Sequence, residues 1–227
     1  MLVPAPLALH GGSLARSVGT LVGEVSGGQA QPAAIVENTA VEVRQAGLNV
    51  LDGGRVTVTG RLLHAPGAVG HHSPGLARER VVLQVRRPAG WTTLAGARTG
   101  RRGRYRLRYR PHRLGSEVVR VRFPGVVHER GSHRRLGLLS VYHAVDASWY
   151  GGGGSMACGG WLTSSTLGVA NKTLPCGTLV RLRYDGRTVR VPVVDRGPYV
   201  AGREYDLTEA TKQALGFEGV GVIWATA

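Results

Sequence analysis

Residues 193–208, VVDRGPYVAGREYDLT, combine residue types and spacing that suit acid–base chemistry. Asp195 closes an apolar run, a Gly-Pro turn follows, and the chain returns to Asp206 just before a segment expected to be helical. Two carboxylates on either side of such a turn are expected to meet at one rim of the fold. A partly buried carboxyl beside another carboxylate has a raised pKa, which suits it to donate a proton near neutral pH.

A purely structural role for the same two residues is the alternative. Asp206 would then cap the helix that follows it. Asp195 would pair with Arg196 or Arg203, whose positive charges oppose a raised carboxyl pKa. Spacing alone favours this structural alternative over catalysis.

The elements around the two carboxylates are readable from local patterns. Residues 178–184 and 187–194 alternate apolar and polar side chains around Asp185-Gly186, which predicts a tight β-hairpin. Residues 209–215 fit one short helix, with Thr208 as N-cap and Gly216 as its end. Residues 219–225 indicate a closing strand, whereas the glycine-rich stretch that begins at Ala147 favours turns.

The first part of the chain is also expected to be β structure. Four runs alternate apolar and polar residues between Gly, Pro and Asp: residues 55–63, 78–87, 104–110 and 118–123. They favour an immunoglobulin-like β-sandwich over residues 36–125. Residues 1–35 are expected to be poorly structured, residues 126–143 to form a linker, and residues 144–227 to form a second domain.

The charge of the chain is concentrated in its first part. Of the formal +15, residues 141–227 carry 8 basic and 7 acidic side chains, which gives +1 there and +14 in the first 140 residues. Alternating arginines on strand faces are most simply a solvated surface. They also suit anionic partners such as wall polymers. Because a solvated surface is the simpler explanation of these arginines, we expect no nucleic-acid partner. We expect no metal site, because His71, His72 and the other scattered histidines lack a ligand spacing.

The cysteine content and the N-terminal sequence bear on the compartment. Cys158 and Cys176 are the only cysteines and cannot complete a four-ligand zinc site, so we predict a disulfide, which persists outside the cytosol. No apolar run is long enough to span a membrane. Residues 1–30 are a poor signal peptide, although a small-residue run ends at Ala30. We expect a secreted or cell-wall protein, monomeric, with a possible signal remnant at its start.

Four motifs in the last part of the chain carry a family resemblance. They are ASWYG (147–151), KTLPCGTLV (172–180), VDRGPYVAGREYDL (194–207) and LGF (215–217). In this order and spacing they resemble the rare lipoprotein A-like double-psi β-barrel family, over residues 144–227. The whole chain resembles exported proteins of actinobacterial type, and the barrel is distantly similar to expansins.

The resemblance implies a six-stranded barrel with one short helix and, in enzymatic members, lytic transglycosylase action on peptidoglycan without a cofactor. Asp195 matches the acid/base residue, and Asp206 would be its electrostatic partner. Where family members commonly have histidine, this chain has Asn171, which cannot take up a proton. Asn171 is expected to contact a sugar hydroxyl of the substrate or to orient Asp195.

The remaining expected substrate contacts are polar or aromatic residues near these motifs. Ser148 is expected to line the cleft, and three aromatic side chains are expected to stack on sugar faces: Trp149, Tyr199 and Tyr205. Residues 144–227 contain no histidine, which excludes a Ser-His nucleophile system there.

Two rival functions stay open at this point. A non-cutting module would bind glycan or loosen the wall through the same cleft, and Asn171 favours it. In the other, the barrel is a structural or protein-binding unit and the basic sandwich carries the function. That alternative requires Asp195 to be closed off from solvent.

Overall fold

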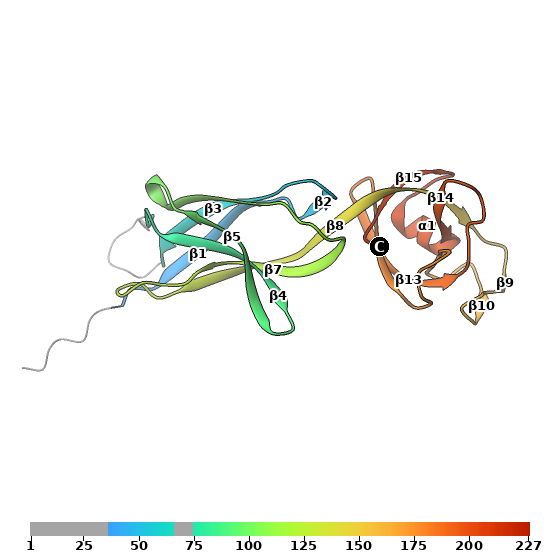
Figure 1. Cartoon of the computed structure of the whole chain (residues 1–227), viewed down its shortest axis with the longest axis horizontal. Coiled ribbons are helices and arrows are strands. Elements are labelled where there is room, and N and C mark those ends of the chain that lie inside the picture. Colours follow the sequence, from blue (N-terminus) through green and yellow to red (C-terminus); the bar gives the residue numbers. More distant parts are fainter. Residues whose placement is uncertain (1–35, 66–74) are drawn as a thin grey trace, which may run out of the picture. The chain divides into compact units, whose positions relative to one another are not determined.

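The structure of the protein is a computed structural model, which describes residues 36–65 and 75–227 (Figure 1). The expected unstructured segment 1–35, together with His71 and His72, lies outside the described residues. Within them the chain is mostly β, as predicted.

The first group of strands forms two sheets that share one core. One sheet has the order β1-β3-β6, and the other runs β5-β4-β7-β8 with the short β2 beside β8. Their bounds are β1 Thr39–Ala46, β2 Asn49–Leu51, β3 Val56–His64, β4 Arg80–Arg87, β5 Gly90–Arg98, β6 Arg104–Tyr109, β7 Gly115–Phe123 and β8 Ser132–Tyr150. A 3₁₀ turn, η1 (Arg101–Gly103), precedes β6.

The four predicted strands of this region are present, and their apolar faces point inward. Val56 and Leu107 from one sheet and Leu83 and Val121 from the other are buried in a single hydrophobic cluster. The alternate positions are polar, and on β6 and β7 they are mostly arginines, so the alternation separates a core face from a polar face. A two-layer sandwich follows, while its immunoglobulin-like topology stays a prediction.

The segment expected to be a linker, residues 126–143, differs from the prediction. Strand β8 begins at Ser132 and continues to Tyr150. It pairs with β7 up to Val141, with β15 from His143 to Ala147 and with β14 up to Tyr150, so hydrogen bonding to successive partners keeps it extended. The end of β8 includes residues 147–150, which the glycine-rich context had suggested were a turn. The assignment of domain boundaries stays a prediction.

The second group of strands closes into the expected six-stranded barrel. The order β14-β11-β13-β12-β15-β8 is completed by pairing of β14 with β8. The additional bounds are β9 Gly154–Ser155, β10 Trp161–Leu162, β11 Val169–Ala170, β12 Leu179–Tyr184, β13 Arg187–Asp195, β14 Arg203–Thr208, α1 Glu209–Leu215 and β15 Gly221–Ala225. Strands β9 and β10 form a separate small hairpin.

The predictions for the Asp185-Gly186 hairpin and for the short helix are confirmed. Asp185 and Gly186 both have positive φ, 42° and 79°, as the tight turn between β12 and β13 requires. Helix α1 ends at Leu215, and Gly216 follows it in the left-handed conformation. Thr208 is the N-cap, but its hydroxyl bonds Thr211 and the Gly168 carbonyl rather than a helix amide. No helix in the described ranges is long and apolar enough to cross a bilayer.

Candidate active site

Asp195 and Asp206 lie together at one rim of the barrel, as their spacing predicted. Asp195 ends β13, Asp206 lies within β14, and β11 is hydrogen-bonded between these two strands. Both carboxylates line a pocket of about 180 Å³, which is also lined by Tyr150, Tyr199 and Arg203. Both side chains are partly exposed, so the pocket rim is accessible from solvent.

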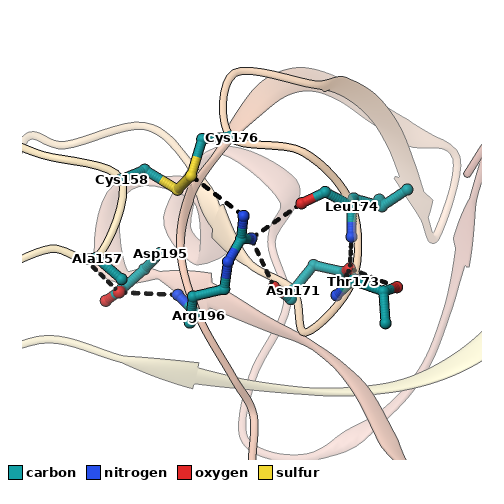
Figure 2. The surroundings of a disulfide bond; sticks show 8 residues. All are labelled: Ala157, Cys158, Asn171, Thr173, Leu174, Cys176, Asp195 and Arg196. Atoms are coloured by element: carbon teal, nitrogen blue, oxygen red, sulfur yellow. Dashed lines mark hydrogen bonds between the residues drawn. A yellow bond between two sulfur atoms is a disulfide. The ribbon is translucent and has the colours of Figure 1, made fainter.

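Main-chain amides fix one oxygen of Asp195. Its Oδ1 accepts hydrogen bonds from the amides of Ala157 and Arg196, each at 2.8 Å (Figure 2). Gly197 follows at φ 125°, a conformation open to glycine, and turns the chain away from the carboxylate. Because both amides reach the same oxygen, Oδ2 is left for a group in the pocket.

A disulfide holds the loop that supplies one of these amides. Cys158 and Cys176 are bonded, as predicted, and the Cys158 amide also donates to the Val194 carbonyl at 3.2 Å. Ala157 precedes Cys158, so the disulfide anchors the loop beside Asp195 (Figure 2).

The Arg196 side chain bonds to the loop that precedes and includes Cys176, rather than to either carboxylate. Its guanidinium donates to the carbonyls of Asn171 and Leu174 at 3.0 and 2.9 Å, and contacts the Cys176 sulfur at 3.2 Å. No ion pair of Asp195 occurs within residues 36–65 and 75–227. The structural alternative, in which an arginine pairs with Asp195, is therefore not what the geometry shows.

Asp206 is tied to the end of β8. Ser148 donates to Asp206 Oδ1 at 2.8 Å, and Arg203 donates to the Ser148 hydroxyl at 3.2 Å. Burial raises the pKa of Asp206, and the Ser148 hydrogen bond and the Arg203 charge oppose this rise. The helix cap is Thr208, so Asp206 does not cap α1.

Tyr150 is a site residue that sequence reasoning missed. Burial raises the pKa of its hydroxyl, and Asp195 and then Asp206 raise it further. Its contact with Asp195 falls short of ordinary hydrogen-bond geometry, and the hydroxyl has no partner among the described residues. The missed signal was strand parity: Ser148 and Tyr150 share a face once residues 147–150 are recognised as strand.

Asn171 lies beside the pocket, but its side chain is committed to the fold. It is only 3% exposed. Its Oδ1 accepts from the amides of Thr173 and Leu174 at 3.0 and 2.8 Å, and its Nδ2 donates to the Glu204 carbonyl at 3.2 Å (Figure 2). These bonds leave little hydrogen-bonding capacity for the expected sugar contact. They indicate that Asn171 positions the loop before Cys176.

The expected aromatic contacts divide into accessible and inaccessible ones. Tyr199 is 82% exposed and lines the pocket. Trp149 is exposed but lies outside the pocket lining, with Lys212 Nζ 4.2 Å from its ring centroid. Tyr205 is fully buried, and its hydroxyl donates to the Ala227 carbonyl, so the expectation that it stacks on sugar is wrong. Ser148 is buried and reaches the site through Asp206.

A metal centre finds no support in the described residues. They contain no group of three or more His, Cys, Asp or Glu side chains that could hold a metal ion. The rim itself provides one carboxyl fixed through Oδ1, a second carboxyl whose pKa is raised by burial, and the buried hydroxyl of Tyr150.

Comparison with known proteins agrees with this architecture. Residues 142–226 match the family described as "Lytic transglycolase". The chain is 45% identical over 82 residues to the probable endolytic peptidoglycan transglycosylase RlpA of Aquifex aeolicus, covering 34% of this chain and 36% of that protein. It is 38% identical over 81 residues to the RlpA of Neisseria meningitidis serogroup A, covering 34% of each chain. The chain thus spans about a third of the length of these relatives.

Among solved structures, the Streptomyces papain inhibitor is similar over 37% of this chain and 92% of that one, at 29% identity and a TM-score of 0.32. The family match and the barrel topology coincide over the same residues. Over residues 142–226 the chain is therefore similar to the rare lipoprotein A-like double-psi β-barrel family in both sequence and barrel topology.

Proposed function

We propose that this protein cleaves the glycan strands of peptidoglycan as a lytic transglycosylase, with Asp195 as its acid and base. The observation that carries the proposal is the placement of Asp195 on an accessible rim, with one oxygen fixed by two amides and with Asp206 lining the same pocket. The names of the similar proteins supply the reaction class.

The proposed reaction uses one proton carrier twice. Asp195 donates its proton to the glycosidic oxygen as the bond from that oxygen to the anomeric carbon breaks. The resulting carboxylate then accepts the proton of the muramic 6-hydroxyl, whose oxygen closes onto the anomeric carbon. The product is a 1,6-anhydro end, Asp195 regains its proton and no water is consumed.

Asp206 and Tyr150 set the conditions for this cycle. A negative charge at Asp206 stabilises positive charge that develops at the anomeric carbon, while Arg203 and Ser148 fix its orientation. The Tyr150 hydroxyl, sealed from solvent and close to Asp195, is the donor available to the Asp195 carboxylate between the two proton transfers. Tyr199 offers an exposed ring on which a sugar can stack.

The proposed setting is the cell wall, outside the cytoplasm. Peptidoglycan strands are the proposed partner of the barrel, and anionic wall polymers are the proposed partner of the basic first part of the chain. We propose that the protein acts as a monomer. The Cys158–Cys176 bond supports an extracytoplasmic location, because such bonds persist in oxidising compartments.

The test is digestion of purified glycan strands, with the mass of the soluble products as readout. Wild type is expected to release products with 1,6-anhydro ends, and Asp195→Asn to release none. Asp185→Asn is the matched control, because it removes an exposed carboxylate from the hairpin turn. If every variant binds strands and none releases products, the proposal fails and a non-cutting wall module takes its place.

A further inference from the structure

One face of the sandwich carries an unusual concentration of positive charge. On the sheet β5-β4-β7-β8, the side opposite the core presents what we call the cationic face: Arg86, Arg120, Arg122, His133 and Arg135. Arg120 lies directly opposite Arg135 on the neighbouring strand, and Arg122 lies opposite His133. Like charges directly opposite each other across two strands, as Arg120 and Arg135 are, destabilise a sheet.

The charges of this face are not neutralised within the described chain. The ion pairs found in residues 36–65 and 75–227 involve none of its members. Burial lowers the pKa of Arg120, and the charges of Arg122, Arg135 and Arg86 lower it further. An external anion bound to this exposed face would relieve the repulsion between its arginines, which favours anion binding there.

The face is also shaped to receive an anion. The Arg120 guanidinium is fixed in place, because its Nε donates to Gln84 Oε1 at 2.9 Å and it stacks 4.0 Å above the Trp91 ring centroid. Arg120 and Arg122 line a pocket of about 480 Å³. The other lining residues, none of them a carboxylate, are Pro124, Gly131, Ser132 and His133.

We propose that this cationic face binds a linear polymer of phosphodiesters, with one phosphate in the pocket of Arg120 and Arg122. Arg120 and Arg122 of β7 and Ser132 and His133 of β8 all line this pocket, and guanidinium groups bind phosphate oxygens in pairs. Arg86 and Arg135 extend the positive charge beyond the pocket, so successive phosphates of a chain find partners. The choice of a wall polymer rests on the proposed function, whereas the anion site itself does not.

A nucleic acid carries the same phosphodiesters but is disfavoured by the aromatic content of the face. Proteins that bind single strands without sequence preference combine basic grooves with open aromatic rings on which bases stack. Here Arg120 covers the ring of Trp91, and Arg86 approaches the same ring at 5.8 Å from its centroid.

The test measures binding of poly(glycerol phosphate) to the full chain at several salt concentrations. Arg120→Gln/Arg122→Gln is expected to weaken binding by about tenfold or more, and to reduce the slope of log K against log salt by roughly 1.5, for two lost phosphate contacts. The matched control is Arg106→Gln/Arg108→Gln, which removes the same charge from exposed positions on β6, opposite Thr59 and Thr57. It is expected to change affinity by less than about twofold.

Further arms separate the competing explanations. Polygalacturonate and oligothymidylate of matched charge are expected to bind more weakly than poly(glycerol phosphate). Equal loss in the two double variants would overturn the proposal in favour of diffuse attraction, and equal binding of oligothymidylate would replace it with nucleic-acid binding. Arg135→Gln, at an exposed position, repeats the test without the packed Arg120.

The outcome is independent of glycan cleavage. Asp195→Asn is expected to bind the polyphosphate as wild type does, and Arg120→Gln/Arg122→Gln to retain cleavage of purified strands that lack phosphate. If wild type binds poly(glycerol phosphate) but does not cleave purified strands, only the proposed reaction is contradicted. If wild type cleaves strands but does not bind poly(glycerol phosphate), only the proposal for the cationic face is contradicted.

Discussion

Two main-chain amides fix one oxygen of the Asp195 carboxylate, and the Tyr150 hydroxyl is a further group close to it. Replacing Tyr150 with Phe keeps the half-buried ring and removes only the hydroxyl, so the fold is expected to survive. Cleavage of glycan strands is expected to fall by about 10- to 100-fold, because the carboxylate loses its nearby donor. The turnover number and the melting temperature of Tyr150→Phe are the measurements, and unchanged turnover would contradict the role given to Tyr150.

Asn171 is expected to matter for stability more than for proton transfer. Asn171→Ala removes three main-chain hydrogen bonds from a buried position and should cost about 2 kcal/mol of unfolding free energy. Asn171→Asp keeps the accepting oxygen and loses the amide donor, so it should fall between Ala and wild type. Urea unfolding tests the order. If Asn171→Ala is as stable as wild type, the side chain is not the anchor of this loop.

Asp206 makes folding stability depend on pH with a defined sign. Its pKa is raised in the folded chain, so between the ordinary carboxyl pKa and the raised value the folded chain binds more protons than the unfolded chain. Its contribution is fully present at acid pH and is lost as pH rises through the raised value.

Urea midpoints of wild type and Asp206→Asn, compared from acid to neutral pH, measure this contribution. Wild type is expected to lose stability relative to the variant as pH rises. A difference that stays constant, or that grows in favour of wild type, would contradict the raised pKa. Asp185→Asn again serves as the control for removal of a carboxylate.

Among the elements, the loop closed by the disulfide couples stability to the site. Cys158→Ser/Cys176→Ser opens a loop of sequence separation 18, which is expected to cost about 3 kcal/mol of unfolding free energy. Because Ala157 adjoins Cys158, the variant is also expected to cleave glycan more slowly than wild type at temperatures where both are folded. Full activity with lowered stability would show that the loop does not position Asp195.

The same elements show where sequence patterns suffice. The Asp185-Gly186 turn and helix α1 were predictable because their signals are local. An Asp-Gly dipeptide readily adopts the positive φ that the turn needs, and Thr208 and Gly216 mark the two ends of the helix. Strand β8 was not, since its residues 132–150 are held extended by partners far away in sequence. The failure to predict Tyr150 as a site residue and the wrong expectation for Tyr205 have the same origin. In both cases the pairing with neighbouring strands decides which side chains of the strand point into the core.

At the scale of the whole molecule, charge and proposed chemistry are separated along the chain. The first 140 residues carry +14 and the remainder +1. Attachment to whole sacculi that bear anionic polymers is therefore expected to weaken strongly between low salt and about 0.5 M salt, where screening is nearly complete at contact distances beyond a few ångströms. Cleavage of purified strands that lack phosphate should change little. Sedimentation with sacculi and product release measure the two effects separately.

If Asp195 cuts glycan by intramolecular transfer rather than by hydrolysis, the new ends carry no oxygen from water. Digestion of purified strands in ¹⁸O-labelled water, followed by mass analysis of the new ends, tests this reaction. Wild type is expected to release 1,6-anhydro ends without the label, and Asp195→Asn to release no products. Labelled reducing ends, or unlabelled anhydro ends released equally by Asp195→Asn, would contradict it.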